Sequence, residues 1–157
     1  MDLQTTAILL IGYQNDYFAE DGILRSVIEE SAVANDALAN SLDLVERLRD
    51  ATVLLASTPI VFTPDYSELV EPVGILKAIV DNQAFKAGTG GCETIPEIKA
   101  FGDRIKELPG KRGLNAFSNT DLDELLQKHG ITTIVLAGAV TSICIDSTGR
   151  SAFDRNY

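Results

Sequence analysis

One cysteine and one lysine stand where they could do covalent chemistry together. Cys144 follows the apolar run 131–137 after a short turn, in the first turn of an expected helix. Lys111 follows another short apolar segment, 105–108. The positive end of a helix dipole stabilises a thiolate, and a nearby lysine adds to that effect and stabilises an oxyanion. Such a pair could attack an amide, ester or nitrile carbon and hold a covalent intermediate.

Each of these residues also has an ordinary structural interpretation. A single cysteine after a strand is most often a small buried hydrophobic residue, and a loop lysine is most often solvated. Spacing alone therefore leaves the catalytic and the structural interpretations of Cys144 and Lys111 open. Cys92 lies in the Gly-rich segment 85–93, which matches neither a phosphate-binding loop nor a dinucleotide fingerprint. We expect it to be a loop thiol.

The elements around these residues predict an α/β fold. Short apolar runs alternate with longer helical patterns, as in βαβ units that build a parallel sheet. Strands are expected at 7–11, 59–63, 105–108 and 131–137, whereas 50–57 is ambiguous. Helices are expected over 31–49, from Thr94 with a capping box to Glu97, from Thr120 to Gly130, and from Thr141 onward.

Three positions fall at the carboxyl ends of expected strands, where ligands of open α/β sheets bind. Gly12 follows the first strand, Lys111 follows 105–108, and Cys144 follows 131–137, which we expect to be central in the sheet. The three positions would converge if their strands are neighbours.

Composition restricts the classes of partner. The chain has 157 residues, of which 45% are hydrophobic, and this suits a single domain with its own core. A formal net charge of −10 argues against nucleic acids and anionic membrane surfaces. No apolar stretch could span a bilayer, and the N-terminus lacks the basic region of a signal peptide. Two cysteines fit a reducing compartment. We therefore expect a cytoplasmic protein that acts on a small molecule.

Three segments resemble the isochorismatase-like cysteine hydrolase superfamily. AILLIGYQNDYF resembles the family's opening strand and turn, an apolar run followed by Asp-x-Gln-Asn-Asp-Phe. KRGLNAFSNTDLDELL resembles the family's lysine segment and matches it at Lys111, Ala116, Phe117, Thr120, Asp121 and Leu122. VLAGAVTSICIDSTGRSAFDRNY resembles its nucleophile segment and matches at Gly138, Thr141, Cys144 and Thr148. The order and spacing are the family's, and the resemblance covers essentially the whole chain.

The resemblance implies a three-layer α/β/α sandwich around a mostly parallel, Rossmann-like sheet, with residues 1–157 as a single domain. It implies a catalytic triad of Asp, Lys and Cys, no cofactor, and a homo-oligomer. A non-proline cis peptide is expected at Val140–Thr141, and N–H groups near Thr141 and Cys144 would form the oxyanion hole. Members of the family usually continue beyond a segment like 154–157 into a further strand and helix, which we expect to be missing here.

This chain departs from the family pattern at Gly12, which takes the place of the catalytic aspartate and leaves the triad incomplete. Asp16 matches the family's second aspartate, which usually bonds backbone groups near the turn. The nicotinamidases of the superfamily bind zinc through Asp and His residues after the second strand. Here no histidine follows Asp65, and the single histidine is His129, at an expected helix end. We therefore expect no metal site.

Two functional hypotheses remain open at this point. The first is a cysteine hydrolase that acts on a small amide-like substrate through Cys144 and Lys111. The second is a catalytically impaired or inactive family member that serves as a small-molecule binding or assembly module. The second explains Gly12 directly but does not explain why Lys111 and Cys144 are both present.

Overall fold

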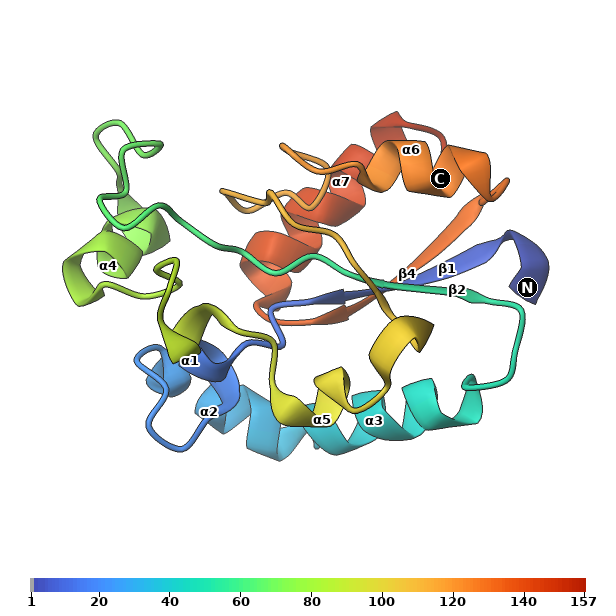
Figure 1. Ribbon diagram of the computed structural model, residues 1–157, viewed down its shortest axis with the longest axis horizontal. Coiled ribbons are helices and arrows are strands. Elements are labelled where there is room, and N and C mark those ends of the chain that lie inside the picture. Colours follow the sequence, from blue (N-terminus) through green and yellow to red (C-terminus); the bar gives the residue numbers. More distant parts are fainter. Residues whose placement is uncertain (1) are drawn as a thin grey trace.

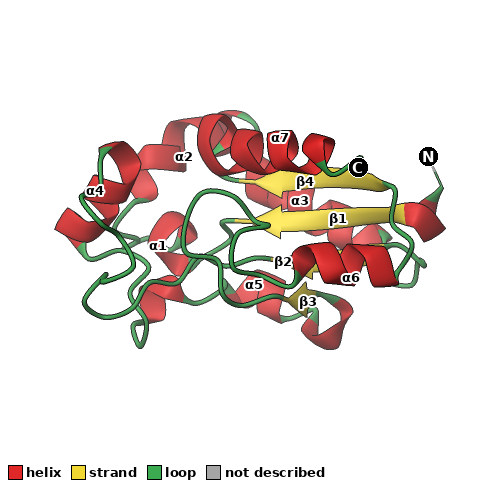
Figure 2. Cartoon of the chain, turned by 90° about the horizontal axis from the view of Figure 1, so that it is seen from above, coloured by secondary structure: helices red, strands yellow, loops and turns green. Residues whose placement is uncertain are grey.

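The computed structural model describes residues 2–157, which form an open sheet with helices on both faces (Figures 1 and 2). Within this range the sheet has four parallel strands in the order β3-β2-β1-β4. The strands are β1 (Thr6–Ile11), β2 (Leu54–Ser57), β3 (Lys106–Glu107) and β4 (Thr133–Gly138). This arrangement confirms the predicted α/β/α sandwich.

β1 forms the centre of the core, and all six of its residues are buried. Successive side chains of a strand point to opposite faces, so a strand covered on both sides is apolar throughout. Leu9 and Ile11 belong to a core cluster with residues of α6 (Leu122–Lys128) and α7 (Asp146–Asp154). Leu10 belongs to a second cluster with residues of α3 (Ala37–Arg47) and α5 (Pro96–Lys99).

A third core cluster lies beyond the carboxyl ends of the strands, where the chain is mostly short helices and loops (Figure 1). The buried aromatic rings of Phe62 and Phe85 belong to it. The helices of this region are α1 (Asn15–Phe18), α2 (Arg25–Ala34) and α4 (Gly74–Asn82). Loops in this part of the molecule lie next to the strand ends and help to enclose the residues that follow them.

The position predicted for the second strand, 59–63, was wrong. β2 lies at Leu54–Ser57, inside the segment with the ambiguous pattern, and residues 59–63 follow it as irregular chain. Pro59 has no N–H to donate to a ladder, so the strand ends before it despite the β-branched residues that follow. Phe62 makes an isolated bridge with Lys86.

The expected helix over 31–49 is two helices, α2 and α3. Asp36 separates them with a left-handed backbone, at φ 47°. Aspartate and asparagine adopt this conformation more readily than other residues with a side chain. The apolar pattern is continuous through the break, so the pattern alone did not reveal it.

β4 is an edge strand among the described residues, because it pairs with β1 alone. The expectation that it is central was therefore wrong for this part of the chain. Strands at 105–108 and 131–137 were predicted correctly within a few residues. α5 begins at Pro96, but Thr94 does not cap it, because the Thr94 hydroxyl donates to Glu107 Oε2 at 2.7 Å.

The helix expected from Thr120 is α6. The Thr120 hydroxyl accepts from the backbone N–H of Leu122 at 3.3 Å, and Gly130 follows the helix at φ 63°. No helix within residues 2–157 is long and apolar enough to cross a membrane.

Candidate active site

The structure places the Lys111 amine next to the Cys144 thiol, close enough for the two groups to interact. Lys111 is 1% exposed and Cys144 is 6% exposed. Burial lowers the pKa of the Lys111 amine, and the neighbouring Cys144 partly offsets this effect. Lys111 is therefore not the solvated loop lysine that its sequence context also allowed.

Backbone contacts on both sides hold the segment that carries Lys111. Leu108 N donates to Ser57 O at 2.8 Å, and Val61 N donates to Lys111 O at 3.1 Å. Gly110 turns the chain between them at φ 105°, and a Cβ there would lie 2.1 Å from a backbone oxygen. The end of β2 and the loop after it thus fix where the lysine enters the core.

Cys144 lies in a π-helical turn, Thr141–Ile145, that runs directly into α7. The cis peptide of this turn joins Ala139 to Val140, so the expected position at Val140–Thr141 was wrong by one residue. β4 ends at Gly138, directly before this cis peptide. Val140 O accepts from the N–H groups of Ile143 (3.0 Å) and Ile145 (3.3 Å), and this closes the turn beneath the thiol.

Gly12 follows β1 with a positive φ of 80° and lies against the nucleophile turn. A Cβ at this position would lie 2.5 Å from Ala139 O, which is closer than real side chains approach. The turn backbone therefore occupies the place where a side chain at position 12 would begin. The structure brings all three predicted positions to one region but leaves no room for a carboxylate at Gly12.

Asp16 is a buried structural carboxylate, 3% exposed. Its Oδ2 accepts from Phe85 N at 2.5 Å, and the carboxylate lies against Gly91, where a Cβ would meet Oδ1 at 2.0 Å. Burial raises the pKa of Asp16, and the bond from Phe85 opposes that shift. These contacts join α1 to the loop 84–92.

Two further buried residues near the site had no role assigned to them from the sequence. Tyr17 is buried, and burial is the main cause that raises the pKa of its hydroxyl, with smaller contributions from Cys144 and Asp16. Gln14 ties two loops to the end of β1: its Nε2 donates to Ile60 O at 2.8 Å and to Cys92 O at 2.6 Å. Both lie in the AILLIGYQNDYF segment, but their roles depend on contacts distant in sequence.

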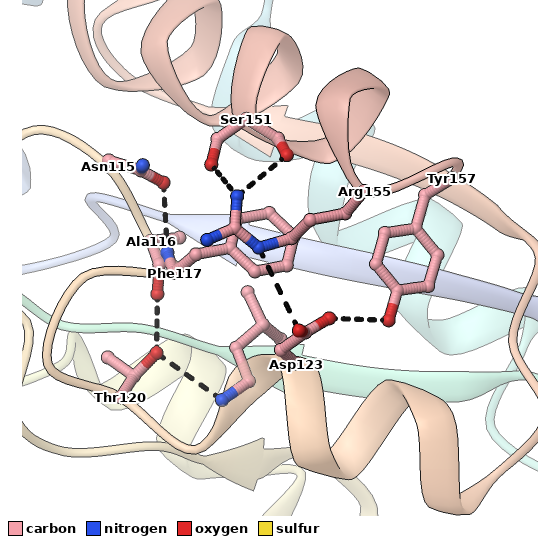
Figure 3. A network of polar contacts seen from close by, with 9 residues as sticks. Asn115, Ala116, Phe117, Thr120, Asp123, Ser151, Arg155 and Tyr157 are labelled. Atoms are coloured by element: carbon pink, nitrogen blue, oxygen red, sulfur yellow. Dashed lines mark hydrogen bonds and ion pairs between the residues drawn. The ribbon is translucent and has the colours of Figure 1, made fainter.

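The lysine segment is anchored to α7, the helix that continues from Cys144. The buried hydroxyl of Thr148 accepts from Ala116 N at 3.0 Å. Further along, the Arg155 guanidinium lies 4.7 Å from the ring centroid of Phe117, and the Tyr157 hydroxyl donates to Asp123 Oδ1 at 2.7 Å (Figure 3). These contacts fix the loop after Lys111 against the helix that carries the thiol.

A cavity of about 1010 Å³ lies beside the nucleophile turn. Residues 139–142 form part of its wall, together with Tyr13 and residues of α2 and α3. The Tyr13 hydroxyl is hydrogen-bonded to Ser41 Oγ at 2.5 Å in this wall. The turn thus lines a ligand-sized space, whereas Cys144 is not part of this wall and belongs to the core cluster packed against α6 and α7.

The residues after β2 do not fit the zinc site of the nicotinamidases. Within residues 2–157 no three His, Cys, Asp or Glu side chains gather closely enough to hold a metal ion. Asp65 Oδ1 accepts from Ser67 N in its own loop, and His129 follows α6 and lies just before β4 begins. The histidine is therefore at the opposite end of β4 from Cys144.

Comparison with known proteins gives one family. Residues 6–157 match the isochorismatase domain. Nicotinamidase 3 of Arabidopsis thaliana is 27% identical over 151 residues, which are 96% of this chain and 67% of that protein. The ureidoacrylate amidohydrolase RutB of Rhizobium rhizogenes is 26% identical over 164 residues, which are 97% of this chain and 66% of that protein. The chain thus spans about two-thirds of the length of these relatives.

A solved structure shows the same fold. The cysteine hydrolase from Pseudomonas syringae pv. phaseolicola 1448A superposes with a TM-score of 0.82 at 22% identity, and the match covers 100% of this chain and 70% of that one.

Proposed function

The chain belongs to the isochorismatase family, and from this membership we propose that it is a cysteine hydrolase of a small amide-like substrate. The observation that carries the proposal is the buried pair of Lys111 and Cys144 at the carboxyl ends of parallel strands. Burying a lysine amine in an apolar core is unfavourable unless a partner or a function compensates for it. Among the described residues, the one ionisable partner of the Lys111 amine is the Cys144 thiol.

The substrate class is suggested by the names of the relatives. Nicotinamide and ureidoacrylate each carry a terminal –C(=O)NH2 group, as a carboxamide in the first and as a ureido group in the second. We propose that the substrate of this chain carries the same terminal –C(=O)NH2 group. Residues 139–142, in the turn that leads to Cys144, line a cavity large enough for such a molecule.

Cys144 is the proposed nucleophile, and Lys111 is the proposed proton carrier. Because burial lowers the pKa of Lys111, its amine can take the thiol proton and leave a thiolate that attacks the amide carbon. Backbone N–H groups near Thr141 and Cys144 hold the oxyanion. The Lys111 ammonium then gives its proton to the departing nitrogen, ammonia leaves, and a thioester remains on Cys144.

Water completes the reaction by the same route. The Lys111 amine takes a proton from water as water attacks the thioester carbon. The intermediate collapses to the carboxylic product and the thiolate, and the ammonium returns the proton to sulfur. Each proton that Lys111 accepts is given back, so the site is regenerated without a carboxylate at Gly12.

We expect this hydrolysis to be slow. By analogy with serine triads, the loss of the acidic member lowers turnover by about 10⁴-fold. Gly12 by itself would also fit an inactive binding module. The retained and buried Lys111–Cys144 contact favours the hydrolase, because a binding module gains nothing from it.

Release of ammonia from nicotinamide and from ureidoacrylate tests the proposal, with Cys144→Ala as the matched control. Slow release by the wild-type protein that the variant abolishes is the expected result. Equal release by both proteins would overturn the role of Cys144.

We further propose that the protein works as a cytoplasmic homo-oligomer without a cofactor and without a nucleic-acid or membrane partner. The net charge of −10 supports the lack of a nucleic-acid or membrane partner, and the two free cysteines support the reducing compartment. Sedimentation velocity at several protein concentrations would test the assembly.

A further inference from the structure

Within residues 2–157, one buried side-chain oxygen has no hydrogen-bond partner, and it is the hydroxyl of Thr58. Thr58 is 0% exposed. Folded proteins pair nearly all of their buried polar groups, because an unpaired one loses its bonds to water without replacement. An unpaired buried hydroxyl at the end of a strand is therefore a position where a bound molecule could supply the missing bond.

Thr58 lies on the face of the sheet that carries the thiol. It directly follows β2, and its N–H donates to Leu10 O at 3.2 Å, so the ladder with β1 continues through it. Because side chains alternate along a strand, Thr58 shares a face with Ala56. Ala56 belongs to the same core cluster as Cys144.

Thr58 also lies beside the lysine segment. Three residues further along, Val61 N donates to Lys111 O at 3.1 Å. The residue before Thr58 accepts from Leu108 N at 2.8 Å, three residues ahead of the lysine. The chain on either side of Thr58 is thus bonded to the chain on either side of the Lys111 turn, at the carboxyl end of the sheet.

We propose that the Thr58 hydroxyl binds the terminal amide group of the substrate that Cys144 attacks. This inference rests on the proposed cysteine hydrolase function and adds a specificity-determining residue to it. A threonine hydroxyl donates one hydrogen bond and accepts two, and a –C(=O)NH2 group offers both donors and an acceptor. A site whose polar group is otherwise unpaired rejects ligands that cannot bond to it. Thr58 would therefore favour amides over ligands of similar size without an amide.

Alkylation of Cys144 by two small reagents tests this inference without turnover. Iodoacetamide carries a terminal carboxamide, whereas iodoacetonitrile has a similar size and no N–H. The ratio of the two rates at Cys144, followed by mass spectrometry of the Cys144 peptide, cancels changes in the reactivity of the thiol itself.

Thr58→Val removes the hydroxyl and keeps the shape of the side chain. It is expected to lower the ratio by about 3- to 10-fold, the value of one hydrogen bond, with Tm unchanged or raised. Thr58→Ser keeps the hydroxyl and is expected to keep the ratio. Thr6→Val is the matched control: Thr6 is also 0% exposed, but its hydroxyl donates to Asp2 O at 2.6 Å. Thr6→Val is expected to lower Tm and leave the ratio unchanged.

Two results would overturn the inference alone. One is an unchanged ratio in Thr58→Val while Cys144 still reacts with both reagents. The other is a loss of Tm in Thr58→Val as large as in Thr6→Val, which would mean that the hydroxyl bonds within the protein. A Cys144 that reacts with neither reagent would instead contradict the proposed hydrolase, and the inference with it.

Discussion

The carbonyl oxygen of Ala139 lies so close to Gly12 that a Cβ at position 12 would be 2.5 Å from it. The end of β1 and the nucleophile turn are thus in backbone contact. The family's acidic residue cannot be introduced here without moving one of the two strand ends. Gly12 therefore does more than remove a carboxylate from the site. Its lack of a side chain lets the end of β1 pack against the nucleophile turn.

Gly12→Asp is expected to lower stability and to give no gain in hydrolysis. Two effects destabilise the variant: the side chain must adopt the positive φ of 80°, and its Cβ would clash with Ala139. A side chain in the left-handed region costs about 1–2 kcal/mol, and the contact adds to that. Urea denaturation of Gly12→Ala and Gly130→Ala separates the two causes, because Gly130 has a φ of 63° and open space around it. A stable Gly12→Asp with a large gain in turnover would refute this account of the site.

Lys111→Met is expected to raise stability at neutral pH while it abolishes hydrolysis. Burial lowers the pKa of Lys111 below its unfolded value, so the folded state disfavours the charged amine. The lysine's contribution to stability is therefore present above the unfolded pKa and is lost as pH falls through the folded pKa. Wild-type stability should rise relative to Lys111→Met as the pH increases toward the ordinary lysine pKa of about 10.4.

Chemical denaturation of both proteins between neutral and alkaline pH measures this difference. Lys77→Met is the surface control, because the Lys77 side chain is 60% exposed and pairs with Asp81 on α4. A constant difference between wild type and Lys111→Met across this range would show that the lysine is charged and compensated in the folded protein.

Thr148→Val is expected to weaken the link between α7 and the lysine segment. It removes the acceptor for Ala116 N and leaves that buried N–H unpaired, which costs about 1–3 kcal/mol. Alkylation of Cys144 should slow as well, because the bond helps to position Lys111 against the thiol. Thr148→Ser restores the acceptor and is expected to recover both properties. If Thr148→Ser behaves like Thr148→Val, the methyl group and its packing are responsible.

Asp16→Asn is expected to stabilise the protein increasingly as pH rises from about 3 to 7. Burial raises the pKa of Asp16 above its unfolded value, so its contribution to stability is greatest below the unfolded pKa. That contribution is lost as pH rises through the folded pKa. Asparagine keeps an oxygen for Phe85 N, which Asp16 Oδ2 accepts at 2.5 Å, and does not ionise. Thermal unfolding of both proteins across this pH range is the measurement, and a variant that loses stability relative to wild type as pH rises would show that the carboxylate is favoured.

Most of the sheet could be predicted because its signals are local. β1 is a continuous apolar run with all residues buried, as a parallel strand with both faces covered requires, and the half-buried β4 carries a similar apolar run. The same rule places β2 wrongly, because the β-branched residues of 59–63 favour a strand more strongly than Leu54–Ser57 does, although Pro59 has no N–H for the ladder. The helix break at Asp36 was missed for a similar reason, because one left-handed residue leaves the apolar pattern intact.

In the candidate site, too, residues with local sequence signals could be predicted and residues that depend on distant contacts could not. Lys111 and Cys144 could be found because both follow apolar runs and match family segments. Thr58 and Tyr17 could not, because a hydroxyl's lack of a partner or its closeness to a thiol depends on residues far away in the sequence. The cis peptide was expected one residue too late, at Val140–Thr141 instead of Ala139–Val140.

The most direct test of the central claim is the rate at which iodoacetamide alkylates Cys144 at pH 7 in wild type and in Lys111→Met. Cys92 serves as the internal control in the same sample, because the two cysteines are similarly buried, at 6% and 8% exposed. We predict that Cys144 reacts faster than Cys92 in wild type and that Lys111→Met slows Cys144 by about tenfold or more, with Cys92 unchanged. A Cys144 that reacts no faster than Cys92, or whose rate is the same in both proteins, would contradict the proposal that Lys111 activates Cys144 for hydrolysis.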